Sequence, residues 1–169
     1  MATVKQDLSI LGTLLPASNY ARRDVFSGTN FPVPCLKFDP STQQSCFFYL
    51  RAINYGSGNI TIRFQWYADT ASSADSVWEA QLAAITPNTD SQDIETKSLA
   101  TLNYVSDTHL GTTGQRLHEA TITLSNLDSI AAGDWCVLKF SRDADGTNAT
   151  DDMTGDALLV GLQVEYSDT

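Results

Sequence analysis

Residues 134–166, DWCVLKFSRDADGTNATDDMTGDALLVGLQVEY, decide the fold. They contain two stretches in which apolar residues recur at every second position, as in strands that bury one face. The first stretch has Cys136, Leu138 and Phe140 on one face, and the second has Leu158, Val160, Leu162, Val164 and Tyr166. Between them, residues 142–155 are rich in Asp, Asn, Thr and Gly, a composition that cannot hold a core together. We therefore expect two central strands of a sandwich, joined by a long acidic loop and covered by the rest of the chain.

The same period of two recurs along most of the chain. It predicts strands over residues 45–53, 59–68, 76–85, 97–105 and 116–124, with 26–38 as an edge or covering segment. The turn NYGSGN at 54–59 predicts that the strands on either side of it pair as a hairpin, with Phe64 and Trp66 on the buried face. Residues 76–85 also contain good helix formers, but the surrounding strands favour β structure. About eight strands without alternating helices predict an all-β fold, an antiparallel jelly-roll-like β-sandwich.

Residues 1–24 are predicted to form an N-terminal arm ahead of a sandwich domain of residues 25–169. Val4, Leu8, Leu11 and Leu15 fall at helical spacing, which predicts a short amphipathic helix that ends at Pro16. Because so short a helix is marginal in water, it must pack on its own sandwich or on another subunit. The candidate partner-binding residues of the arm are Lys5, Leu8, Ile10, Leu11, Leu14, Leu15, Arg22 and Arg23.

The composition limits the classes of partner. The chain has 169 residues and a formal net charge of −10, so it lacks the basic face that DNA and RNA binders need. It has no run of 18 apolar residues that would predict a membrane span, and no signal-peptide pattern, so synthesis in a cytoplasm is expected. Residues 1–66 hold six basic and three acidic residues, and the remainder holds four basic and seventeen acidic ones. This asymmetry either serves solubility or lets the basic end dock on an acidic partner or a neighbouring copy.

Residue types that carry catalytic chemistry are few. The chain has no Gly-rich phosphate loop and no HExxH motif, and no Ser-His-Asp or Cys-His arrangement stands out. Of its two histidines, His118 falls on an apolar strand face. The odd count and wide spacing of Cys35, Cys46 and Cys136 fit neither a disulfide framework nor a zinc site, so free, packed thiols are expected. We therefore expect no enzymatic activity and no cofactor.

The acidic loop raises the question of a metal ion. Asp143, Asp145, Asn148, Asp151 and Asp152 offer hard oxygen ligands at short spacing, which suits Ca²⁺. The loop misses the EF-hand pattern, however, because its glycine comes two positions early and no Glu occupies the twelfth position. A solvated acidic loop is therefore preferred to a Ca²⁺ site over Asp143–Asp152.

Several stretches together resemble a group of β-sandwich domains in tailed-bacteriophage virion proteins. They are NYGSGNITIRFQWYA at 54–68, SVWEAQLAAI at 76–85, AAGD at 131–134, RD at 142–143, DD at 151–152, GDALL at 155–159 and VEY at 164–166. The resemblance implies a capsid decoration (cement) protein that binds the outer surface of a phage head and stabilises it. It further implies a homo-oligomer, a trimer, whose partner is the major capsid protein of the same particle, with the virion as its location.

The alternative function is a receptor- or carbohydrate-binding module of a head or tail fibre. β-Sandwiches with exposed aromatic rings often bind sugars, and Tyr67, Tyr104 and Trp135 are candidates for outward faces. The competing interpretation is that these rings cover the edges of the core or the seams between subunits.

Overall fold

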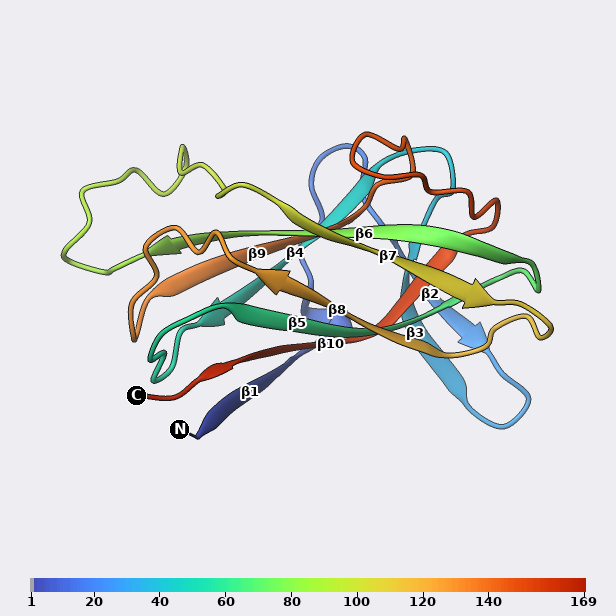
Figure 1. Cartoon of the computed structure of the whole chain (residues 1–169), viewed down its shortest axis with the longest axis horizontal. Coiled ribbons are helices and arrows are strands. Elements are labelled where there is room, and N and C mark those ends of the chain that lie inside the picture. The colour runs from blue at the N-terminus through green and yellow to red at the C-terminus, as the bar shows by residue number, and fades with distance from the viewer. Residues whose placement is uncertain (1) are drawn as a thin grey trace.

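Two antiparallel sheets lie face to face in the computed structural model, which describes residues 2–169 (Figure 1). In these residues, β1, β2, β3, β5, β8 and β10 form a six-stranded sheet, and β4, β6, β7 and β9 form a four-stranded sheet. The elements are β1 (Thr3–Leu8), the 3-10 helix η1 (Ile10–Gly12), β2 (Arg22–Ser27), β3 (Pro32–Phe38), β4 (Gln44–Arg51), β5 (Ile60–Ala68), β6 (Ser73–Ile85), β7 (Asn103–Leu110), β8 (His118–Leu124), β9 (Trp135–Arg142) and β10 (Ala157–Ser167). The prediction of an all-β, antiparallel, jelly-roll-like sandwich is confirmed. In the part of the chain that the structure describes, no helix has the length and apolar character needed to cross a membrane.

The two strands predicted to be central are central, each in a different sheet. β9 lies between β4 and β6 in the four-stranded sheet, and β10 lies between β5 and the pair β3 and β1 in the six-stranded sheet. Residues 143–156 therefore carry the chain from one sheet to the other. The inward faces of both strands contribute to a single core between the sheets.

The predicted hairpin across residues 54–59 is wrong. β4 pairs with β9, whereas β5 pairs with β10 and β8, so the turn after β4 crosses from one sheet to the other. Alternation tells which face of a strand is buried, but it does not tell which strand lies beside it. The inward face of β5 was predicted correctly, because Phe64 and Trp66 are both 0% exposed.

The alternation along β10 is interrupted by a β-bulge. The register shifts between Leu159 and Gly161, and both Leu158 and Leu159 are fully buried. Leu159 lies in the core between the sheets, while Leu158 packs with Cys35 and Tyr67 in a small cluster outside that core. The predicted face of Leu158 and Val160 is therefore wrong, because the extra residue of a bulge shifts the side chains on one side of it to the opposite face.

The first residues form a strand and not the predicted helix. β1 pairs with the second half of β10, from Leu162 to Ser167, and Figure 1 shows the two chain ends side by side. A spacing of four positions, as between Val4 and Leu8, keeps two residues on one face of a helix and also on one face of a strand, so it could not decide between them. The segment packs on its own sandwich, where Ile10 is buried. Whether residues 1–24 can be separated from the sandwich as an arm stays a prediction.

The core is built around aromatic rings from both sheets. The fully buried rings are Phe38, Phe64, Trp66, Trp78 and Phe140, and those of Trp78 and Phe140 are stacked with centroids 5.4 Å apart. The three cysteines are free and buried, as predicted. Burial raises the pKa of each thiol, which keeps it protonated and unreactive.

Candidate functional site

The outer face of the four-stranded sheet carries aromatic side chains that the core does not use. Along β4, the core-facing residues Cys46, Phe48 and Leu50 alternate with Phe47, Tyr49 and Arg51. The second set therefore lies on the outer face. Tyr49 is 47% exposed, and Phe47 is half-buried.

Tyr49 and Trp135 form a side-by-side pair on this face. Trp135 begins β9 and lies opposite Arg51, so it is a diagonal neighbour of Tyr49. The two ring centroids are 5.4 Å apart and the ring planes are tilted by 34°. With Leu50, Arg51 and Pro87 they line a hollow of about 550 Å³. Two neighbouring rings at a small tilt provide a continuous apolar surface in contact with water.

Polar groups surround the aromatic pair. The Arg51 Nε donates a hydrogen bond of 3.1 Å to the carbonyl of Gly133, which holds the guanidinium beside Trp135. Farther along the face, Lys139 lies between Phe47 and Gln81 in register, and Gln81 Nε2 donates to the carbonyl of Ala100 at 3.0 Å. Within residues 2–169, neither Arg51 nor Lys139 has a carboxylate within 4.0 Å. Both cations therefore remain available to hydroxyl or carboxylate oxygens of a ligand.

The three aromatic residues named from the sequence have different environments. Trp135 is half-buried on this outer face, and Tyr104 on β7 is 50% exposed at its far edge. Tyr67 lies on the outward face of the six-stranded sheet, as predicted, but it is only 6% exposed because its ring packs edge-on against Phe26 of the same sheet. It therefore offers little surface to a ligand. Tyr49 was not among the residues predicted from the sequence. In Phe47-Phe48-Tyr49 both faces carry aromatic rings, and only the position of Cys46 and Leu50 indicates which face is buried.

The eight candidate partner-binding residues of the N-terminal segment do not gather on one surface. Lys5 pairs with Glu165 at 3.2 Å, Arg22 pairs with Asp24 at 3.3 Å, and Ile10 is buried. Leu8 and Leu15 are half-buried, Arg23 donates to the carbonyl of Thr13, and Leu11 and Leu14 are 65% and 53% exposed. A role of these residues in binding a capsid or a sister subunit stays a prediction.

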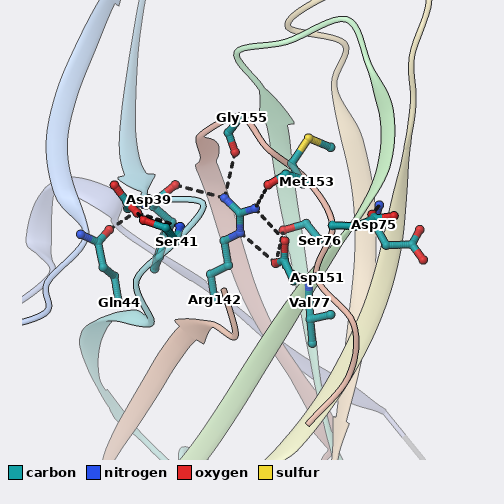
Figure 2. A network of polar contacts seen from close by, with 12 residues as sticks. Asp39, Ser41, Gln44, Asp75, Ser76, Val77, Arg142, Asp151, Met153 and Gly155 are labelled. Carbon is teal, nitrogen blue, oxygen red and sulfur yellow. Dashed lines mark hydrogen bonds and ion pairs between the residues drawn. The ribbon is translucent and has the colours of Figure 1, made fainter. Parts of the chain in front are cut away.

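The acidic loop is not the solvated loop predicted from the sequence. The side chains of Arg142 and Asp151 are both 0% exposed and form a bidentate ion pair, which Figure 2 shows inside the polar network. Asp143 is also fully buried and accepts hydrogen bonds from the backbone N–H groups of residues 147, 148 and 149. A short, polar sequence suggested exposure, but these carboxylates fold the loop onto the sandwich. The described residues contain no group of three or more His, Cys, Asp or Glu placed to hold a metal ion.

The two histidines face each other inside the sandwich. Their ring centroids are 4.7 Å apart, His109 is 0% exposed and His118 is 9% exposed, which confirms that His118 lies on the core face of β8. The Nε2 atoms of both rings are buried, without a hydrogen-bond partner among the described residues. Burial, and next the neighbouring His109, lower the pKa of His118, so this ring is held neutral.

Comparisons with known proteins identify the fold. No protein-family model matches the chain, and no curated protein matches it. A carbohydrate-binding module specific for non-crystalline cellulose superposes with a TM-score of 0.51 at 13% identity, covering 93% of this chain and 88% of that one. A family 11 carbohydrate-binding module from Clostridium thermocellum, in complex with a β-1,3-1,4-mixed-linked tetrasaccharide, gives 0.50 at 10% identity, covering 95% and 94%. At such low sequence identity, the superpositions show a shared jelly-roll β-sandwich fold and no more. Nothing in the comparisons identifies a phage virion protein.

Proposed function

We propose that this protein is a carbohydrate-binding module without catalytic activity, which binds sugar rings on the outer face of its four-stranded sheet. The observation that carries the proposal is the Tyr49–Trp135 pair, two exposed or half-exposed rings 5.4 Å apart beside a hollow of about 550 Å³. The C–H face of a sugar packs on aromatic rings, while its hydroxyl groups need nearby polar partners. Arg51, which lies opposite Trp135, and Lys139, a diagonal neighbour of Tyr49, can supply them.

The likeness in fold supports the same proposal. Two solved sandwiches that superpose with TM-scores of 0.50 and 0.51 are carbohydrate-binding modules, one in complex with a mixed-linked tetrasaccharide and one specific for non-crystalline cellulose. The capsid-decoration hypothesis has no comparable support, and the residues predicted to bind the capsid are spread over several surfaces of the sandwich.

The chemistry of the hollow favours binding over hydrolysis. Glycoside hydrolysis uses two carboxyl groups on either side of the bond that is cut. The residues that line the hollow are Tyr49, Leu50, Arg51, Pro87 and Trp135, which include no carboxylate. Glu79, on the same face of β6, is 2% exposed and hydrogen-bonded to the side-chain amides of Gln43 and Asn148. A sugar held on the aromatic pair is therefore not placed between an acid and a base.

A glycan array followed by affinity electrophoresis with the polysaccharides that bind would test the proposal. Trp135→Ala should weaken binding by about fivefold or more, because truncating a central aromatic contact of an interface costs over ~1 kcal/mol. Phe31→Ala is the matched control, since Phe31 is an aromatic residue 67% exposed elsewhere on the molecule. No binding to any glycan would refute the function. Equal losses in the two variants would refute the site.

A further inference from the structure

The segment between η1 and β2 runs along the free edge of β4. Leu14 and Phe47 exchange two backbone hydrogen bonds of 2.9 Å each. Farther on, Ser45 N–H donates to Asn19 O at 2.9 Å, and Ala21 N–H donates to Ser45 O at 3.1 Å, which forms the bridge between Tyr20 and Ser45. The segment therefore adds a fifth, irregular row beside the four-stranded sheet.

Two side chains of this segment lie on the same outer face as the aromatic pair. Residues that face each other across a β-bridge point to the same side of the sheet. Leu14 is the bridge partner of Phe47 and Tyr20 that of Ser45, and both partners alternate with the buried Cys46. Leu14 is accordingly 53% exposed and Tyr20 is 46% exposed.

The exposed apolar side chains follow one another along β4. Tyr20 lies level with Ser45, Leu14 with Phe47, and Trp135 with Arg51, while Tyr49 lies on β4 itself. From Ser45 to Arg51 is a distance of about 20 Å, because a strand rises by roughly 3.3 Å per residue. The apolar strip thus has a ring at each end, and it is longer than a single sugar.

The strip runs along β4, from Trp135 on β9 at one end to Tyr20 in the added row at the other, and it does not extend to β6 or β7. Beside Tyr49 in the crossing direction lie Val137 and then Ala83, neither of which has a ring. Tyr104, the exposed ring at the opposite edge, lies opposite Glu79 and apart from the Tyr49–Trp135 pair. The segment itself is held in place, since Thr13 is 0% exposed and donates to Ile10 O at 2.9 Å.

We propose that Leu14 and Tyr20 extend the sugar-binding surface, so that the ligand is the interior of a linear polysaccharide lying along β4. This inference rests on the proposed function and adds the length and direction of the ligand. A strip about 20 Å long has room for several linked sugars, and a free monosaccharide covers only one of its rings. The segment that the sequence assigned to partner binding therefore binds glycan, through Leu14.

Calorimetry with β-1,4-linked gluco-, xylo- and manno-oligosaccharides of two and six sugars tests the inference. If the array selects another polysaccharide, its oligosaccharides of the same two lengths replace them. The wild-type protein should bind six sugars more tightly than two. Tyr20→Ala should weaken binding of the six-sugar ligand by about three- to tenfold, the effect of one aromatic contact, and leave the two-sugar ligand unchanged. Tyr104→Ala is the matched control and should change neither affinity.

The outcomes separate the two proposals. If Trp135→Ala weakens binding but Tyr20→Ala does not, the sugar-binding surface ends at β4. The inference is then wrong, while the proposed function stands. If Tyr104→Ala loses affinity for the six-sugar ligand and Tyr20→Ala does not, the ligand crosses the sheet, and the inference is also wrong. Equal affinity of the wild-type protein for two and six sugars would likewise show that the inference is wrong. If no glycan binds the wild-type protein, the proposed function itself fails. Thermal melting checks that Tyr20→Ala is folded, which is expected because the hydrogen bonds that join the segment to β4 are made by backbone atoms.

Discussion

Replacing Asp151 by Asn should destabilise the protein far more than replacing an exposed carboxylate of the same loop. All five N–H groups of the Arg142 guanidinium are used, which is the full donor capacity of an arginine. Nε donates to Asp151 Oδ2 at 2.9 Å, and one Nη donates to Asp151 Oδ1 at 2.8 Å and to Met153 O at 2.7 Å. The other Nη donates to the carbonyls of Phe38 and Gly155 at 3.3 and 3.0 Å. Asp151 is the one anion in this set.

The magnitude follows from the burial of both partners. Their side chains are 0% exposed, so the change to Asn leaves a buried cation without its counter-charge. Removing one partner of a buried ion pair costs about 3–5 kcal/mol. The new amide also presents N–H donors to a guanidinium that has only donors. For a domain of this size, each kcal/mol lowers the melting temperature by roughly 2–4 °C, so a fall of about 6–20 °C is expected.

Urea unfolding followed by tryptophan fluorescence measures the effect, because Trp66 and Trp78 are fully buried and change environment on unfolding. Asp145→Asn is the control, since Asp145 belongs to the same loop but is exposed. It should stay within about 0.5 kcal/mol of the wild type, as surface substitutions do. A free energy of unfolding for Asp151→Asn within about 1 kcal/mol of the wild-type value would refute the argument that this pair anchors the loop.

Two further predictions concern the core. Phe64→Ala should lower the free energy of unfolding by about 3–5 kcal/mol, because this fully buried ring contacts both Trp78 and Phe140 and its loss leaves a cavity; an unchanged urea midpoint would show that the ring is not packed there. The lowered pKa of His118 means that the unfolded state takes up its proton at a higher pH than the folded state. Its contribution to stability is therefore complete above about pH 6.5 and is lost as the pH falls toward the folded-state value. Thermal melts between pH 7.5 and 5 should show a smaller loss of stability for His118→Gln than for the wild type, and parallel curves would contradict this.

The period-two patterns determined the fold class and most of the buried faces. A strand that buries one face against a core must alternate, so Cys136, Leu138 and Phe140 were assigned to the core from the sequence alone. The two strands predicted to be central in the sandwich are β9 and β10, and the structure places each inside a different sheet. The period-two patterns failed at the bulge near Gly161, because one extra residue reverses the faces and leaves no mark in the composition.

Tertiary structure alone decided which strands pair and which polar residues are buried. Strand pairing depends on contacts between distant parts of the chain, so the turn after β4 carried no sign that it crosses between sheets. The loop of Asp143 and Asp151 had the composition of a solvated segment, and only the ion pair with Arg142 and the hydrogen bonds from backbone amides make the burial of these carboxylates favourable. The candidate site has the same origin. Tyr49, Trp135 and Tyr20 come from three separate segments, and only the pairing of β4 with β9 and with residues 14–20 brings their rings onto one face.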